Sequence, residues 1–341
     1  MKVVLEPMIF AFDHDLSKQD LIDYLEELQA LDEWWDLHRD EMYVQDTAGE
    51  ILCSNSYYPL ADTLKPLMEK YGIDFIQYGD VNRIIDKMLN KAKSVESLYS
   101  GLSGMKKRTF HRPISEISKV MRPREMDDGL QNLLWHIFMA HKLGGHDEKA
   151  FVILTKGVSD NVSVDYEYEV LDENDGVQVK SGASVVNCKS SLEDFLNDAQ
   201  TPFLLWKTAE QKDDLDLGVK VSVAQLNGKA DVKRICSVFN FTIQNSFYDD
   251  YCNGHYQCKD QDVRSAIQAV TDAVTDQNLR QVHAIRTGKK GNDPQLVLNG
   301  FGALRREITT SIKLAYWKKG CVYKIANMRE HDFFEPTWED S

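Results

Sequence analysis

A hairpin near the middle of the chain holds the residues that could most directly do chemistry. Residues 163–171 and 177–184 alternate as strands do, and they flank the turn Asn174-Asp175-Gly176, which favours a tight connection. Their polar side chains could hold a metal ion or contact a phosphate: Asp165, Glu167, Glu169, Gln178 and Lys180. Carboxylates bind hard divalent cations, the bound cation activates water, and a nearby lysine stabilises developing negative charge. The pattern is therefore compatible with a metal or phosphate site on this hairpin.

The register of this hairpin decides which of these groups can meet. With a two-residue turn at Asp175-Gly176, Glu173 is expected opposite Gln178, and Glu169 is expected diagonal to Lys180. Gln178 and Lys180 would then project from the face that carries the acids. This register favours Glu169, with Glu173 second, as the acid nearest Lys180. The alternative is a solvated sheet face with ordinary cross-strand pairs.

The order of elements around this hairpin resembles that of a known nuclease superfamily. Residues 127–210 are predicted to form a helix, three strands, a helix and a strand, and the third strand carries Gln178-Val179-Lys180. This arrangement resembles the core of the PD-(D/E)xK nucleases, in which an acid and an (E/D/Q)-x-K pair bind a divalent metal. The resemblance implies a metal-dependent nuclease that hydrolyses phosphodiesters. Glu169 and Glu173 would be its Mg²⁺ ligands, and Glu169, Gln178 and Lys180 its catalytic residues.

A second candidate site lies in the basic C-terminal region. The stretch from Asp262 to Phe334 is similar to the RelE/YafQ-like toxins, which cleave messenger RNA, and the matching residues are Arg305-Arg306, Leu314-Ala315-Tyr316 and His331-Asp332-Phe333-Phe334. Metal-free RNA cleavage needs a proton acceptor and cationic phosphate ligands. The resemblance implies His331 as the acid/base. The nucleic-acid contacts that we expect are Arg286, Arg305, Arg306 and Lys313. A toxin-like fold that only docks or binds RNA is the alternative.

Cysteines provide a third constellation. Cys252, His255 and Cys258 could supply three zinc ligands, with Cys236 as a fourth, although the usual CxxC spacing is absent. The six cysteines are spread along the whole chain, which is typical of reduced thiols in a cytoplasmic protein rather than of a disulfide scaffold. The alternative to a Zn²⁺ site is therefore a set of separate thiols.

Charge is distributed unevenly along the chain. The whole chain carries a net charge of −14, which argues against a general nucleic-acid coat. Residues 280–331 nevertheless carry a net charge of +8, so the remainder sums to −22. This asymmetry is compatible with DNA or RNA as a local anionic partner, or with docking of the basic segment on an acidic protein surface.

The predicted elements indicate an α+β, multidomain chain. We expect a small α/β domain at 1–100, a basic linker at 101–126, a PD-(D/E)xK-like αβββαβ domain at 127–214 and a basic, RelE-like α+β domain at 215–341. Strands are also expected at 73–78, 203–206 and 219–223. No run of apolar residues approaches the length of a membrane span, and the N-terminus does not have the pattern of a signal peptide.

Two classes of function follow from these patterns. The first is a nuclease, or a nuclease-derived nucleic-acid binder, in a prokaryotic toxin or anti-phage defence system. The second is a non-catalytic subunit that binds protein partners in a multiprotein defence complex. Nucleotide-hydrolase and serine-hydrolase signatures (Walker A, GxGxxG and GxSxG) are absent from the sequence.

Overall fold

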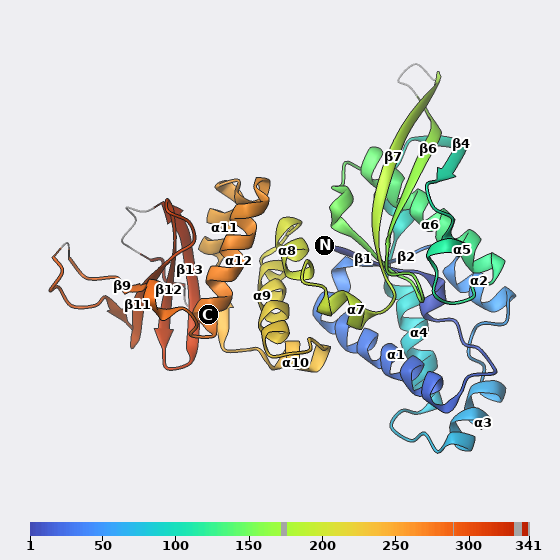
Figure 1. The fold of residues 1–341 in the computed structure, drawn as a ribbon, viewed down its shortest axis with the longest axis horizontal. Helices are drawn as coiled ribbons and strands as arrows, with labels where there is room; N and C mark the ends of the chain where they lie inside the picture. Colours follow the sequence, from blue (N-terminus) through green and yellow to red (C-terminus); the bar gives the residue numbers. More distant parts are fainter. Residues whose placement is uncertain (172–175, 289, 331–335, 340–341) are drawn as a thin grey trace. The chain divides into compact units, whose positions relative to one another are not determined.

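The computed structural model describes residues 1–171, 176–288, 290–330 and 336–339. The chain divides into two compact units, Met1–Phe195 and Leu196–Ser341, and each unit is described here by itself (Figure 1). Each unit contains a mixed β-sheet packed with helices, so the predicted α+β, multidomain class is confirmed. Among the described residues, no helix is both long and apolar enough to cross a membrane.

A seven-stranded sheet forms the centre of the first unit. Its strand order is β3-β2-β1-β5-β7-β6-β4. The strands β3, β2, β1, β5 and β7 are parallel, and β6 runs antiparallel to its two neighbours, β7 and β4. The strands are β1 (Lys2–Leu5), β2 (Met42–Val44), β3 (Lys93–Ser94), β4 (Leu102–Phe110), β5 (Phe151–Leu154), β6 (Asn161–Leu171) and β7 (Val177–Lys189). The short strands β1 and β5 are buried along their whole length, as expected for central strands of a parallel sheet.

Helices of the first unit pack on this sheet. They are α1 (Lys18–His38), α2 (Ala48–Ser54), α3 (Ala61–Tyr71), α4 (Tyr78–Lys91), α5 (Ile114–Ile117), α6 (Arg124–Lys142) and α7 (Leu192–Asn197), which extends into the second unit. Helix α1 begins after Ser17, whose hydroxyl accepts a hydrogen bond from the Asp20 N–H at 3.2 Å and so caps the helix. On α6, Phe138 stacks on Tyr166 of β6 with 4.1 Å between the ring centroids.

The domain boundaries expected from the sequence differ from those of the structure. Strand β1 pairs with β5, so residues 1–100 and 127–195 share one sheet instead of forming two domains. The predicted basic linker contains β4, which pairs with β6 along most of its length. The predicted strand at 73–78 is not formed, because Gly72 ends α3 in the left-handed region and α4 begins at Tyr78.

The second unit has its own sheet, with the strand order β10-β11-β12-β13-β8 and with β9 paired to β11. The strands are β8 (Phe241–Ile243), β9 (Val282–Ala284), β10 (Val297–Leu298), β11 (Phe301–Glu307), β12 (Ile312–Lys319) and β13 (Val322–Glu330). The helices are α8 (Thr201–Lys207), α9 (Lys212–Leu226), α10 (Val232–Ser237), α11 (Asn245–Asn253) and α12 (Asp260–Val274). The strands predicted at 203–206 and 219–223 are therefore parts of the helices α8 and α9.

Candidate functional site

The predicted metal site depends on the register of β6 and β7, and that register differs from the expected one. Glu169 lies opposite Val179, Tyr168 lies opposite Lys180, and Val170 lies opposite Gln178. Residues directly opposite each other in an antiparallel pair project from the same face. Glu169 therefore projects from one face of the ribbon, whereas Gln178 and Lys180 project from the other, so the expected shared face is wrong.

The acids of β6 have basic neighbours on β4 instead. Lys106 Nζ lies 2.7 Å from Glu169 Oε1, and Lys107 is paired in register with Glu167. Glu169 is thus an ion-pair partner of an exposed lysine. Glu173, the second expected metal ligand, lies outside the described residues. This face of the ribbon has the cross-strand charge pairing that the sequence also allowed.

The packing of α6 gives a physical reason for this register. Tyr166 lies opposite Gly182, and a Cβ atom at Gly182 would lie 3.1 Å from the Phe138 ring. A larger residue at this position would force the Phe138 ring to shift by a few tenths of an ångström. Because Phe138 stacks on Tyr166 and contacts Tyr168 edge-on, the side chains of Tyr166 and Tyr168 must face the helix. Lys180 shares the face of Tyr168 but remains exposed further along the ribbon.

Beyond its short pairing with β5, strand β7 has an open edge. Strand β5 pairs only with Asn187, Cys188 and Lys189. Among the described residues no strand pairs with 177–186 on the side away from β6, although the Val185 N–H donates to the Glu148 carboxylate. Figure 1 shows β6 and β7 as a long ribbon whose distal part extends past the helices of the first unit. Such an edge presents backbone donors and acceptors that another strand can pair with.

Exposed apolar side chains lie on β7 on the same face as the acids of β6. Leu171 and Val177 lie opposite each other, and Val179 and Val185 project from the same face. These four side chains are 56%, 55%, 55% and 50% exposed, respectively. We call 177–185 together with these side chains the β7 edge. Apolar side chains gathered beside an open strand edge are typical of an interaction surface.

The usual ligand position of a doubly wound sheet lies elsewhere in the first unit. In the sheet, β2 lies on one side of β1 and β5 lies on the other. The direction in which successive strands are added therefore reverses between β1 and β5. Ligands of open α/β sheets bind beyond the carboxyl ends of the strands at such a point. Here Glu6 follows β1, Thr155 follows β5, and the Thr155 hydroxyl donates to Glu6 Oε2 at 2.9 Å.

Arg122 fills this position. Its guanidinium lies 3.0 Å from Glu6 Oε1 and 3.0 Å from Thr155 Oγ1, and its Nε donates to Asp127 Oδ1 at 2.9 Å. The side chains of Arg122 and Glu6 are 2% and 0% exposed. Burial raises the pKa of the Glu6 carboxyl, and the charge of Arg122 opposes that shift. Arg122 lies within the basic linker expected at 101–126, yet its side chain is buried.

In the second unit, Arg306 has a structural role rather than the expected contact with nucleic acid. Its side chain is 1% exposed and forms an ion pair with Asp272 of α12. Its Nη1 also donates to the Gln277 carbonyl at 2.8 Å. A phosphate could not reach this guanidinium in the structure, so its assignment as a phosphate ligand was wrong.

The other expected nucleic-acid ligands are more exposed, and their assignment stays a prediction. Lys313 Nζ lies 3.0 Å from Glu307 Oε1, and Lys313 is opposite Arg329 on β13. Arg305 lies opposite His283 of β9 and is half-buried. Arg286 is exposed and donates to the Asp293 carbonyl at 2.5 Å. His331, the expected acid/base, lies outside the described residues.

The cysteine constellation does not form a cluster in the structure. Cys252 is half-buried on α11, where burial raises the pKa of its thiol, and Cys258 is exposed. Among the described residues, no three His, Cys, Asp or Glu side chains are placed to hold one metal ion. Neither Zn²⁺ at Cys252, His255 and Cys258 nor Mg²⁺ at Glu169 gains support, and both stay predictions.

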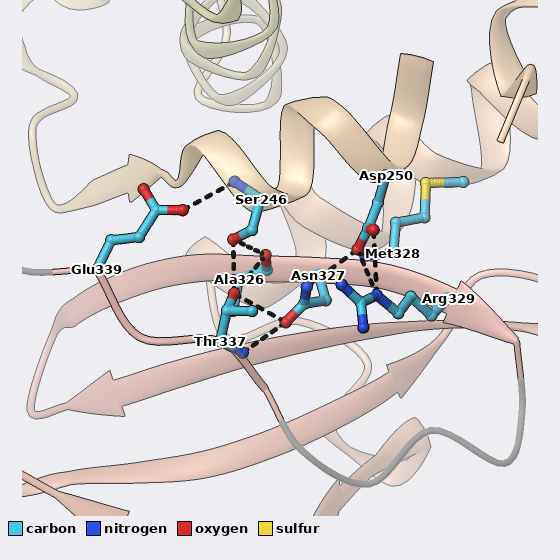
Figure 2. Close-up of polar contacts among 8 residues, drawn as sticks. All are labelled: Ser246, Asp250, Ala326, Asn327, Met328, Arg329, Thr337 and Glu339. Atoms are coloured by element: carbon cyan, nitrogen blue, oxygen red, sulfur yellow. Dashed lines mark hydrogen bonds and ion pairs between the residues drawn. The ribbon is translucent and has the colours of Figure 1, made fainter. Parts of the chain in front are cut away.

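A shallow hollow of about 440 Å³ lies between α11 and β13. Its lining includes Asp250, Asn253, Gly254, Tyr256, Met328, Arg329 and Glu330. Within it, Asp250 accepts hydrogen bonds from Arg329 Nε at 2.9 Å, Asn327 Nδ2 at 3.0 Å and the Met328 N–H at 3.3 Å (Figure 2). Asp250 therefore joins α11 to β13, and its charge is balanced by Arg329.

Three comparisons were made with known proteins. Neither the family models, nor the curated proteins, nor the solved structures gave a match to this chain.

Proposed function

We propose that this protein is a non-catalytic, protein-binding component of a larger assembly, and that its partner adds an extended segment to the β7 edge. The observation that carries the proposal is the open edge of β7 beside four exposed apolar side chains. Main-chain pairing with an open strand edge supplies affinity, and the flanking side chains supply specificity.

The side chains of β7 indicate the chemistry of the partner segment. Val177, Val179 and Val185 project from one face, while Lys180 projects from the other. Lys142 of α6 approaches that second face, because its Cε would lie 3.3 Å from a Cβ at Gly182. A strand that alternates apolar and acidic residues would therefore match both faces of the β7 edge.

Binding of a defined peptide tests this proposal. A short fluorescent peptide of alternating valine and glutamate should bind the intact chain, and an alternating valine–lysine peptide should bind about tenfold more weakly. Val179→Lys should reduce binding of the first peptide by about tenfold, since the added charge blocks the apolar face. The control is Val297→Lys, an equally exposed valine on β10, which should bind like the native chain. Equal binding by both variants would remove the β7 edge from the proposal.

Self-association and nuclease assays complete the test. A dimer that is lost in Val179→Lys would identify a second copy, rather than a different protein, as the occupant of the edge. Nuclease activity stays a prediction of the sequence. It is measured with DNA and RNA, with and without Mg²⁺, on the native chain, Lys180→Ala and His331→Ala. Cleavage abolished by either substitution would overturn the non-catalytic proposal.

A further inference from the structure

The C-terminal segment 336–339 is bound to the second unit by contacts from three consecutive residues. We call Pro336–Glu339 the tail. The Thr337 N–H donates to Asn327 Oδ1 at 2.6 Å, and the Thr337 hydroxyl lies 2.5 Å from the Ser246 hydroxyl (Figure 2). Asn327 is fully buried and donates to Asp250 with its other amide atom. The buried Asn327 amide thus binds the backbone of the tail, and the Ser246 hydroxyl contacts the hydroxyl of Thr337.

An aromatic slot receives the next residue. The Trp338 ring meets Phe301 and Trp317 edge-on, with 5.4 Å between centroids in each pair. Lys324 Nζ lies 4.3 Å from the centroid of the Trp338 ring, within the range of a cation–π contact. Trp317 Nε1 donates to the Thr337 carbonyl at 2.6 Å, so it also binds the tail backbone.

The N-terminus of α11 receives the carboxylate. Glu339 accepts hydrogen bonds from the Asn245 N–H at 2.9 Å and the Ser246 N–H at 2.8 Å. Gln244, which precedes the helix, makes no side-chain cap to it, so Glu339 takes the place of a cap. Partial burial alone would raise the pKa of the Glu339 carboxyl. The two N–H groups and the Ser246 hydroxyl outweigh burial, and the pKa lies below its usual value.

The tail backbone is also paired. The Gln244 side-chain amide, in the orientation that satisfies both of its atoms, donates to the Thr337 carbonyl at 3.2 Å and accepts from the Glu339 N–H at 3.1 Å. Lys324 Nζ donates to the Glu339 carbonyl at 3.1 Å. A surface that pairs the backbone and separately accommodates a hydroxyl, an indole and a carboxylate has the features of a peptide-recognition site.

We infer that this surface is a recognition site for an extended segment carrying a hydroxyl, an indole and a carboxylate on consecutive residues, and that the chain's own tail occupies it and excludes such a segment of a partner protein. The strands β10 to β13 and β8 pair with one another without the tail. We therefore expect the sheet of the second unit to form when the tail is removed, with the contacts of Trp338 and Glu339 left open to another segment. This inference does not rest on the β7 edge.

The test uses a fluorescein-labelled peptide of residues 336–341 and a chain that ends at Glu330. The peptide should bind the shortened chain at least about tenfold more tightly than the intact chain, as measured by fluorescence anisotropy. Peptides with tryptophan replaced by alanine, or with glutamate replaced by glutamine, should bind the shortened chain about tenfold more weakly. In the shortened chain, Lys324→Ala should weaken binding, and the exposed Lys233→Ala should not.

A second variant protects the test against misfolding of the shortened chain. Trp338→Ala/Glu339→Gln weakens the tail in a chain of full length, and this variant should also bind the peptide more tightly than the intact chain. Failure of the peptide to bind either variant, with native circular dichroism, would show that the tail is only a fixed part of the fold. Equal affinity for the intact and shortened chains would also overturn the inference. If the intact chain forms a dimer and the shortened chain does not, the site is occupied by the tail of a second copy and the intramolecular inference is overturned.

Discussion

Single side chains decide which of the sequence-based assignments survive. Arg305 and Arg306 are neighbours with similar chemistry, yet strand alternation turns Arg306 toward α12, where it is buried against Asp272. A dipeptide cannot reveal which of its two arginines faces the core until the strand's partners are known. The same alternation separates Glu169 from Lys180, because a shift by an odd number of residues reverses the face of a whole strand.

Arg306→Ala should destabilise the second unit without acting through a ligand. It leaves the buried carboxylate of Asp272 without its charge partner, and the expected cost is about 3–5 kcal/mol in the free energy of unfolding. Urea denaturation measures this loss. The control, Arg280→Ala, removes an exposed arginine and should change stability by less than about 0.5 kcal/mol. A stable Arg306→Ala chain would mean that the ion pair with Asp272 does not form in solution.

At the scale of elements, helix α1 is linked to the start of α7 by a carboxyl group with a shifted pKa. Glu27 Oε1 accepts from the Leu192 N–H at 2.7 Å. Burial raises the pKa of Glu27 against the effect of this hydrogen bond, and with smaller contributions from Glu193 and Asp194 the pKa reaches about 7. The folded state thus holds a proton that the unfolded chain releases near pH 4.5.

Glu27→Gln should therefore change how stability depends on pH. The pKa of Glu27 is higher in the folded chain than in the unfolded chain. The free energy of unfolding of the native chain therefore falls as pH rises from about 4.5 to about 7. Glutamine keeps an acceptor for Leu192 without the charge. The variant should match the native chain near pH 5 and exceed it by about 1–2 kcal/mol near pH 8, after allowance for partial exposure. Thermal unfolding at both pH values measures this, and the exposed Glu26→Gln should show no such divergence.

Elements in which apolar and polar residues alternate with a clear helical or strand period could be predicted from the sequence. Elements made of a continuous apolar run could not. The amphipathic helix α6 and the hairpin of β6 and β7 were expected close to where they occur. Segments 203–206 and 219–223 were expected as strands, but both are buried helices, since an apolar run alone does not distinguish the two. The Trp206 indole donates to the Leu215 carbonyl and joins α8 to α9, a contact without a local signal.

At the scale of the whole molecule, each unit has a sheet and an apolar core of its own. One core gathers α6 against β6, β7 and β5, and another gathers α9, α11 and α12 against β11, β12 and β13. The four-part division expected from the sequence could not anticipate this, because pairing of β1 with β5 joins residues about 150 positions apart. The tail site was missed for the same reason, since it combines residues from 244–250, 301–329 and 337–339.

Two overlapping pieces test this division. Residues 1–198 and residues 192–341 both retain α7, and each should unfold in one cooperative thermal transition when expressed alone. Circular dichroism and tryptophan fluorescence follow the transitions, since each piece keeps buried tryptophans. A piece that is unfolded alone but recovers structure when mixed with the other would show that the two units form one cooperative body.

Arg122 gives the first unit a property that its topology alone would not suggest. Between β1 and β5, where doubly wound proteins commonly leave room for a nucleotide or another small molecule, this chain supplies a cation of its own. An anionic ligand at this position would have to compete with Glu6 for the Arg122 guanidinium, which is already shielded from water. The strand order that usually marks a cofactor pocket therefore serves here to brace the sheet from within.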